Sequence, residues 1–395
     1  MPTDDLDHIP LRSKDDFIVF GAPQILEDEI NEVVASMRAA WLGTGPKVAR
    51  FENEFAAYID APHALAVNSC TAALHLAILA AGIGPGDEVI TTALTFCATA
   101  NAIIHAGATP VVADIDPISM NIDPASVSDR ITPKTKAVIP VHFAGRPCDM
   151  DQLTALASAH GLILIEDCAH AVETTYHDVH AGRFGDIGCF SFYATKNLTT
   201  GEGGMLITNS DVIAEDVKMR ALHGMTRDAW RRYSDDGYKH YQVVLPGFKY
   251  NMMDLQAAIG LHQLARLEAN WNRRRDVWEK YQSALSDTAL KLPANPAPKT
   301  KHAFHLYTVL VDPGETGLTR DQFLQKMTAE GVGVGVHYLS LTDHPFYQRA
   351  FGWNSTLVPE ATRVGQQTVS LPLSARLTDR DVSDVIEAVH RVLAR

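Results

Sequence analysis

The sequence predicts an α/β fold: a mainly parallel β-sheet covered by helices on both faces, followed by a smaller C-terminal domain that mixes strands and helices. Two observations support this prediction. From Asp87 onward, short apolar runs of strand length alternate with helical patterns. A chain of 395 residues can also bury a large core and suffices for two domains. We place the large domain at residues 1–260 and the small domain at residues 261–395.

The N-terminal part should begin with a loose arm, residues 1–20, before a helix at Gln24–Ala40 that the Gly/Pro-containing stretch 41–46 ends. A helix at Val48–Tyr58 and a strand at Ala64–Val67 follow. Asn68–Gly82 then predicts a capped helix that starts at a turn of small residues. Free backbone N–H groups at such a helix start can hold a phosphate, although an ordinary capped helix has the same pattern.

The remaining elements follow in chain order. Further strands are predicted at Glu88–Thr92, Thr109–Ala113, Ala137–Val141, Leu162–Glu166, Gly188–Phe192 and Met205–Thr208, with helices at Thr95–Ala106, Met150–His160 and Val212–His223. A charged, aromatic excursion at residues 226–245 is expected to reach a partner subunit. A long amphipathic helix, Met253–Leu285, should begin the small domain, whose other elements are predicted at Leu306–Val311, Arg320–Glu330, Val332–His337 and Thr378–Leu393.

Composition excludes several classes of protein. The net charge of −13 argues against binding to nucleic acid or to an anionic membrane, because both need a basic surface. The longest apolar stretch, residues 72–84, is too short to span a bilayer, and the acidic start of the chain is unlike a secretory signal. Five widely spaced cysteines indicate reduced thiols in a cytoplasmic protein, and no metal-binding spacing of histidines and cysteines is present.

Two strand ends bear the residues that indicate chemistry. Lys196 lies between two apolar runs, where burial would favour a neutral amine able to form a Schiff base, unless it is a loop lysine paired with Glu202. Asp167 and His170 follow another apolar strand, although Asp167 alone could be a helix cap. Together with the Ser69–Ala72 turn, these residues match the needs of pyridoxal 5'-phosphate (PLP): an amine, an acid for the pyridine nitrogen and a phosphate site. Ser191 would add to the phosphate site, and Phe96 would supply a stacking ring.

Several stretches in a fixed order also resemble one family. They are residues 43–48 (GTGPKV), 67–77 (VNSCTAALHLA), 84–89 (GPGDEV), 95–102 (TFCATANA), 166–171 (EDCAHA), 195–204 (TKNLTTGEGG), 246–260 (PGFKYNMMDLQAAIG), 335–338 (GVHY) and 371–373 (LPL). By these motifs the chain resembles the DegT/DnrJ/EryC1/StrS family of PLP-dependent sugar aminotransferases. The resemblance implies a seven-stranded sheet of the aspartate-aminotransferase type (fold type I).

The resemblance also implies roles for single residues. Lys196 would bond to PLP and move protons, Asp167 would pair with the pyridine nitrogen, His170 would lie beneath the cofactor, and Phe96 would stack on its ring. The phosphate would be held by Cys70, Thr71, Ala72 and Ser191. Lys249 and Asn251 would reach the neighbouring subunit's site in a homodimer with shared active sites, with Lys249 at a position where many relatives have asparagine. Substrate contacts would come from Thr44, Lys249, His337, Tyr338 and Arg231.

We therefore predict a cytoplasmic aminotransferase that moves an amino group from L-glutamate, through PLP and pyridoxamine phosphate (PMP), to a nucleotide-diphosphate-linked keto-deoxysugar of the 4-keto-6-deoxy type. Three alternatives stay open at this point: a PLP-dependent sugar dehydratase, an aminotransferase of a cyclitol or other non-nucleotide ketone, and a non-catalytic sensor. Sugar dehydratases that resemble this family commonly replace the lysine or add clustered cysteines, and neither change is found here. A sensor could lose Lys196 or Asp167 without harm, whereas both are intact.

Overall fold

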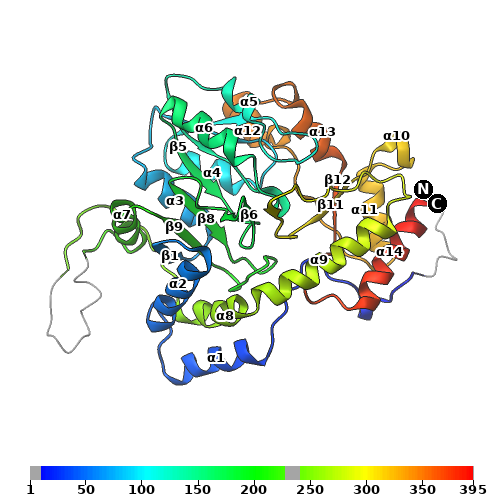
Figure 1. Ribbon diagram of the computed structural model, residues 1–395, viewed down its shortest axis with the longest axis horizontal. Coiled ribbons are helices and arrows are strands. Elements are labelled where there is room, and N and C mark those ends of the chain that lie inside the picture. Colours follow the sequence, from blue (N-terminus) through cyan, green and yellow to red (C-terminus); the bar gives the residue numbers. More distant parts are fainter. Residues whose placement is uncertain (1–9, 227–240, 395) are drawn as a thin grey trace.

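The computed structural model describes residues 10–226 and 241–394. Arg231 and most of the predicted excursion therefore lie outside the described residues. Figure 1 shows a large lobe built around a twisted sheet and a second, smaller group of helices and strands beside it. The α-helices are α1 (Glu27–Arg38), α2 (Pro46–Ile59), α3 (Cys70–Ala80), α4 (Ala98–His105), α5 (Pro124–Ser128), α6 (Met150–His160), α7 (Asp211–Ala221), α8 (Asp254–Ala265), α9 (Leu267–Ala284), α10 (Pro313–Thr316), α11 (Arg320–Ala329), α12 (Pro345–Phe351), α13 (Pro359–Gln367) and α14 (Asp379–Leu393).

The central sheet has seven strands in the order β1-β9-β8-β5-β4-β2-β3. β9 is antiparallel to both of its neighbours, whereas the pairs from β8 to β3 are parallel, so the predicted mainly parallel sheet is confirmed. The strands are β1 (His63–Val67), β2 (Glu88–Thr92), β3 (Thr109–Ala113), β4 (Thr135–Ile139), β5 (Ile163–Asp167), β8 (Ile187–Ser191) and β9 (Gly204–Thr208). These bounds lie within two residues of the predicted ones, because buried apolar runs define the strands in both cases.

Helices cover the sheet on both faces. The apolar helix α3 packs against β5, β8 and β9, and its residues form one core with α4 and α7. On another part of the sheet α2 and α8 enclose an aromatic cluster in which Phe51, Phe55, Phe190 and Phe192 meet edge to face. Burial on both faces explains why these strands have continuous apolar runs instead of alternating patterns.

The predicted single helix Met253–Leu285 is wrong: the structure has two helices, α8 and α9, that meet at Arg266. The backbone of Arg266 leaves the helical region with ψ at 14°, and its side chain forms an ion pair with the buried Glu29 of α1. α8 thereby stays on α1 and α2, while α9 extends toward the C-terminal elements (Figure 1). The break has no Gly or Pro, so the sequence pattern runs through it without a signal.

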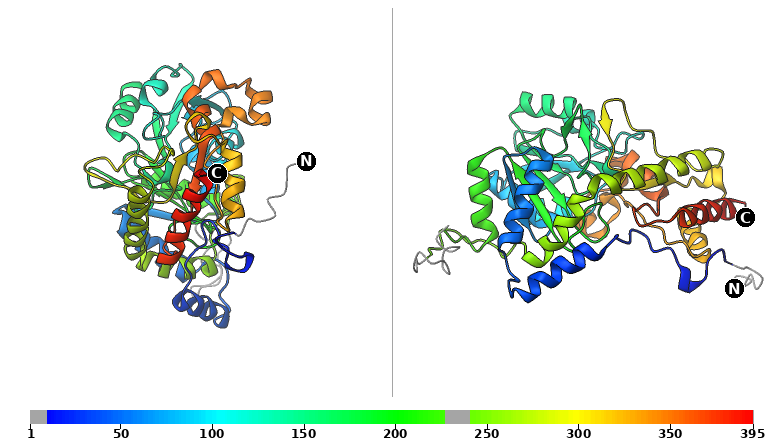
Figure 2. Two further views of the ribbon diagram at one scale, coloured as in Figure 1. Left: turned by 90° about the vertical axis from the view of Figure 1, so that its right-hand side faces the viewer. Right: turned by 60° about the horizontal axis from the view of Figure 1, so that its bottom comes forward.

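The C-terminal elements surround a second core. The antiparallel pair β11 (Tyr307–Leu310) and β12 (Thr368–Leu371) packs with α9, α11 and α14, and Ile18 from the N-terminal segment joins this core. Arg12, almost fully buried, contacts Asp381 at 2.7 Å and Asp384 at 2.8 Å on α14. The N-terminal segment therefore runs from the C-terminal elements to α1, as Figure 2 shows.

Two predictions for this region need comment. Val332–His337 does not form a strand, since the structure gives it only single bridges, from Val332 to Ile18 and from Gly335 to Ser370. Side chains of the segment 341–364, which includes α12, pack into a core with residues 93–120 of the large lobe. The domain division at residues 260/261 stays a prediction.

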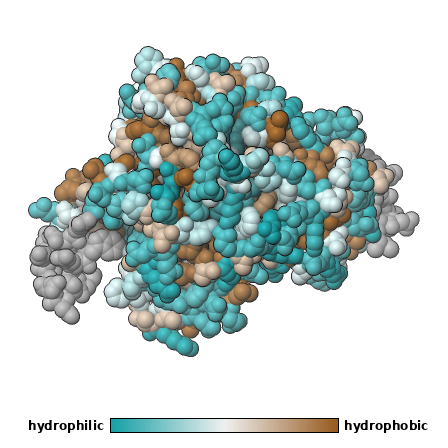
Figure 3. Space-filling view, in the orientation of Figure 1, coloured by the Kyte–Doolittle hydropathy of each residue, from teal (hydrophilic) through white to brown (hydrophobic). Residues whose placement is uncertain are grey.

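The small β-structures complete the fold. A three-stranded sheet joins β6 (Thr175–Tyr176), β7 (Val179–His180) and β10 (Thr300–Lys301). The face of the molecule in Figure 3 is largely hydrophilic, with apolar side chains in separate patches. None of the helices in the described part of the chain is both long and apolar enough to cross a membrane.

Candidate active site

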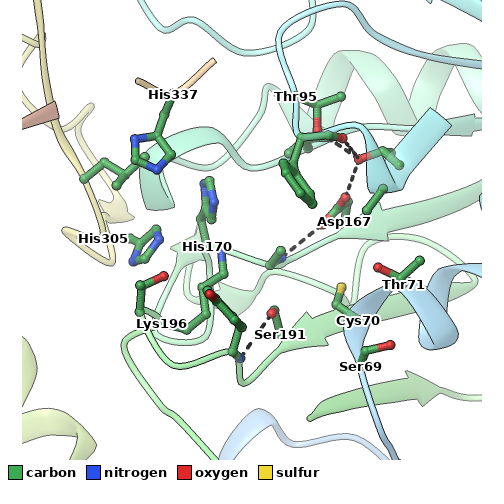
Figure 4. Close-up of a pocket in the computed structure, with 18 of the residues that line it drawn as sticks. Ser69, Cys70, Thr71, Thr95, Asp167, His170, Ser191, Lys196, His305 and His337 are labelled. Atoms are coloured by element: carbon green, nitrogen blue, oxygen red, sulfur yellow. Dashed lines mark hydrogen bonds between the residues drawn. The ribbon is translucent and has the colours of Figure 1, made fainter. Parts of the chain in front are cut away.

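A cavity of about 520 Å³ lies where several strands of the central sheet end. Asp167 ends β5 and Ser191 ends its neighbour β8, so both side chains reach the same edge. The start of α3 and the segment 95–99 after β2 line the same cavity (Figure 4). Ligand sites of open α/β sheets are found at this edge, because the loops that follow parallel strands meet there.

Asp167 lies at the base of the cavity and is 3% exposed. Its Oδ2 accepts a hydrogen bond from Thr99 Oγ1 at 2.9 Å, and its Oδ1 accepts one from the backbone N–H of Ala169 at 3.1 Å. Burial nevertheless raises the pKa of this carboxyl group. The carboxylate is therefore a buried anion that a cationic group in the cavity would stabilise.

Lys196 faces the same cavity from the turn that follows β8. Burial lowers the pKa of its ammonium to about 8, so about a tenth of the side chain is a neutral amine at pH 7 and about half at pH 8. The alternative, a loop lysine paired with Glu202, is not what the structure shows, since no ion pair joins these two residues. A largely desolvated lysine in the same cavity as a buried carboxylate is a suitable nucleophile toward an aldehyde.

The start of α3 forms the anion-binding end of the cavity. Ser69 caps the helix by accepting the N–H of Ala72 at 3.1 Å, and Cys70 and Thr71 supply backbone N–H groups of the first turn. β9 approaches this turn so closely that a Cβ on Gly204 would lie 2.5 Å from the carbonyl carbon of Ser69. Ser191, at the end of β8, lies next to this turn in the cavity (Figure 4). This end therefore offers several donors to a phosphate group.

The opposite end has aromatic and imidazole side chains. His170 Nδ1 accepts the N–H of Ala144 at 3.2 Å, so its protonated Nε2 donates to the Tyr338 hydroxyl at 3.0 Å. His337 Nδ1 lies 2.9 Å from Ser370 Oγ, and burial and the charge of Lys196 lower the pKa of His337 to about 4. Phe96, 58% exposed, lies over the cavity 6.0 Å from the Tyr338 ring. These side chains are neutral and can enclose an organic ring.

Sequence reasoning missed two residues of this site, Thr99 and His305. Thr99 holds Asp167, and His305 lines the cavity beside Lys196. His305 also contacts Asn197, which connects it to a buried ion pair between Glu173 and Arg274. Thr99 falls in a family-like stretch and could have been found there. His305 lies in an apolar run more than a hundred residues from Lys196, and only the tertiary structure brings the two together.

Other predicted residues lie outside this cavity. Asn251 Nδ2 donates to Thr44 Oγ1 at 2.7 Å, and both residues line a second cavity of about 510 Å³ beside β1. The backbone carbonyl of Lys249 accepts a hydrogen bond from Nδ2 of Asn68, the residue that follows β1, at 3.3 Å. Their proposed contacts with a partner subunit stay predictions, and Arg231 falls in the part of the chain that is not described.

A buried group of His142, Glu166 and Cys168 has donor atoms close enough for a metal ion. Hydrogen bonds account for it instead. His142 Nδ1 accepts the N–H of Cys148 at 3.1 Å, so its protonated Nε2 donates to Glu166 at 3.0 Å. Both oxygens of Glu166 also accept backbone N–H groups, from Gly182, Phe184 and Gly185. This cluster ties β5 to the 182–185 loop.

The cavity as a whole fits PLP. A buried carboxylate that forms no ion pair with the described residues suits the pyridine nitrogen, a helix start with free N–H groups suits the phosphate, and a desolvated lysine between them suits the aldehyde. Each of these features is a property of the protein's own residues: the raised pKa of Asp167, the close approach of Gly204 and the lowered pKa of Lys196.

Comparison with known proteins gives the same result. Residues 23–390 match the family model of the DegT/DnrJ/EryC1/StrS aminotransferase family. The spore coat polysaccharide biosynthesis protein SpsC of Bacillus subtilis is 48% identical over 384 residues, which cover 97% of this chain and 99% of SpsC.

Solved structures are also similar to this chain. Spr1654 from Streptococcus pneumoniae in its PLP form has a TM-score of 0.88 and 32% identity, with 96% of this chain and 99% of that chain covered. DesV of S. venezuelae, solved in complex with a ketimine intermediate, has a TM-score of 0.85 and 33% identity, with 93% and 95% covered. The chain therefore belongs to the DegT/DnrJ/EryC1/StrS aminotransferase family and is a PLP-dependent sugar aminotransferase.

Proposed function

We propose that the protein transfers the amino group of L-glutamate to a nucleotide-diphosphate-linked keto-deoxysugar of the 4-keto-6-deoxy type. The observation that supports this most is the meeting of Lys196 and Asp167 in one cavity with a phosphate-binding helix start. The relatives add support: PseC of Helicobacter pylori, 26% identical with a TM-score of 0.88, is an aminotransferase involved in the biosynthesis of pseudoaminic acid. The choice of sugar and donor follows from the family resemblance.

The residues of this chain divide the work as follows. PLP, when bound, supplies an electron sink for the carbon that carries the transferred amine. Lys196 would hold PLP through its aldehyde and, as a free amine, would carry a proton to and from the substrate carbon. Asp167 keeps the pyridine nitrogen protonated by pairing with it, and Thr99 orients Asp167. Cys70, Thr71, Ala72 and Ser191 bind the phosphate, while Phe96 and His170 enclose the ring.

The substrate site is proposed to form between two copies of the chain. Lys196 is the only lysine or arginine among the described residues that line the cavity, whereas a nucleotide diphosphate carries several negative charges. We therefore infer a homodimer in which Lys249, Asn251 and Arg231 of one copy complete the other's site. Thr44, hydrogen-bonded to Asn251, would approach the sugar from that same copy, whereas His337 and Tyr338 would approach it from the copy whose Lys196 lines the cavity. Exposed apolar side chains of the N-terminal helix and the loop after it, Ile30, Met37 and Trp41, are suited to such an interface.

An absorbance titration tests the proposal. Purified protein is loaded with PLP, freed of excess cofactor and mixed with L-glutamate, and the same is done with Lys196→Ala. We expect an absorbance band of lysine-bound cofactor in the parent only, which glutamate converts to the PMP band. A panel of nucleotide ketosugars should then reverse the change, with cyclitol ketones as the comparison.

Each outcome has a consequence. A cofactor band that no amino donor changes would contradict transamination from glutamate. Reversal by a cyclitol ketone but by no nucleotide sugar would overturn the proposed substrate.

Cytoplasmic location is proposed on the five cysteines, all of which are free thiols in the structure, as expected of a reducing compartment.

A further inference from the structure

His305 is a buried imidazole that the predicted catalytic set does not include. It is 6% exposed, lines the cavity, and packs against His170 with ring centroids 4.4 Å apart. Figure 4 shows it on the same side of the cavity as Lys196 and His170. Burial and the nearby charge of Lys196 lower its pKa well below the usual value, so the ring is neutral at physiological pH.

Hydrogen bonds determine which ring nitrogen bears the proton. Asn197 Nδ2 donates to Glu173 Oε2 and to the carbonyl of Ala303, both at 2.9 Å. Its Oδ1 is therefore an acceptor, and His305 Nδ1, 3.0 Å away, must be the donor. Glu173 is in turn fixed by the buried Arg274 of α9. The chain Arg274–Glu173–Asn197 thus holds His305 in the Nδ1–H tautomer.

The other nitrogen, Nε2, is left with a free lone pair. It has no hydrogen-bond partner among the described residues, and it is not fully buried. Because His305 lines the cavity, Nε2 is open to the cavity. His170 differs, because its Nε2–H is already donated to Tyr338. Lys196 Nζ likewise forms no hydrogen bond with the described residues. A vacant acceptor and a vacant donor therefore lie on one side of the cavity.

We propose that His305 is a positioning residue whose Nε2 accepts an N–H of Lys196 once that amine has left the cofactor. The inference rests on the proposed role of Lys196 as the cofactor-bonding residue. The hydrogen bond restrains the flexible lysine in the cavity and leaves its lone pair free to take up a proton. Because His305 is neutral and a poor base, it orients the amine without removing the proton from it.

The first test uses the cofactor-free protein. With ¹⁵N-labelled histidine, two-bond ¹H–¹⁵N spectra should show His305 as the Nδ1–H tautomer, identified by the signal lost in His305→Phe. His302 is an internal reference, since its Nδ1 accepts the N–H of Phe304 at 2.8 Å and it must be the opposite tautomer. A protonated Nε2 on His305 would overturn the proposal.

The second test measures the pKa of Lys196 in the cofactor-free protein by competitive labelling with acetic anhydride across pH. Loss of an acceptor for the ammonium in His305→Phe should lower this pKa by about one unit or more. His305→Gln, whose amide oxygen can replace Nε2 as the acceptor, should restore most of the lost pKa of Lys196. His302→Phe removes a buried imidazole of the same segment away from the cavity and should leave it unchanged. Equal values in the parent and His305→Phe would refute the inference.

A third readout connects the inference to turnover. In single-turnover reactions with the amino donor, His305→Phe should react more slowly because the lysine amine is no longer oriented, with little change in donor affinity and partial rescue by His305→Gln. The first two tests need neither PLP nor donor. If glutamate proves inactive while the tautomer and the Lys196 pKa behave as stated, the proposed donor fails and this inference stands.

Discussion

The buried ion pair between Arg274 and Glu173 offers a quantitative test of how the two lobes are held together. Arg274 is 3% exposed and Glu173 is fully buried, and α9 supplies the arginine while the segment after β5 supplies the glutamate. Arg274→Met keeps a long side chain but leaves Glu173 with Asn197 as its remaining side-chain partner. Breaking a buried pair in this way costs about 3–5 kcal/mol, because an uncompensated charge stays inside the protein.

That cost converts to a change in melting temperature. Unfolding entropy is about 2.1 cal/mol/K per residue, or roughly 0.8 kcal/mol/K for 395 residues, so the variant should melt about 4–6 °C lower at pH 8. Differential scanning calorimetry of the cofactor-free protein at one scan rate measures this difference.

Arg275→Met is the matched control on the neighbouring residue. Arg275 is 38% exposed and pairs with Asp276 at 3.2 Å, so its loss should cost less than about 1 kcal/mol, near 1 °C. The reasoning would be refuted if both variants melted alike.

Three further predictions concern single positions. Gly204→Ala places a Cβ 2.5 Å from the backbone at the start of α3. We therefore expect the affinity for PLP, measured by fluorescence titration, to fall at least about tenfold. The control Gly84→Ala, whose Cβ has 3.7 Å of clearance, should bind PLP as the parent does. Because the pKa of His337 is lowered to about 4, the folded protein binds its proton less readily than the unfolded chain. Stability should therefore decline as pH falls from about 6.5 to 4, and His337→Phe should reduce that decline in pH-dependent melting curves. Arg12→Ala removes contacts to two aspartates of α14 and should cost about 1–3 kcal/mol, against less than about 1 kcal/mol for the exposed Arg380→Ala, both measured by melting temperature. Equal losses in the two arginine variants would show that the N-terminal segment contributes little.

Much of the fold follows from local patterns. Buried strands such as Ile163–Asp167 and Ile187–Ser191 are continuous apolar runs in the sequence. Helices that begin at a capping residue, such as the helix that Ser69 caps, can be predicted from the sequence as well. The break at Arg266 was missed because it depends on Glu29, more than two hundred residues away, and on packing against α1. The buried Arg12 was missed for the same reason: its partners are near the other end of the chain.

The candidate site divides in the same way. By itself the sequence identified Lys196 and Asp167, because reactive residues at strand ends and in family motifs are local features. The tertiary structure alone decided that Thr99 holds Asp167, that Lys196 does not pair with Glu202, and that His305 lines the same cavity as the lysine and is held in one tautomer. The physical reason is that burial, pKa and tautomer depend on which groups meet in space, whereas local sequence determines only the elements that bring them there.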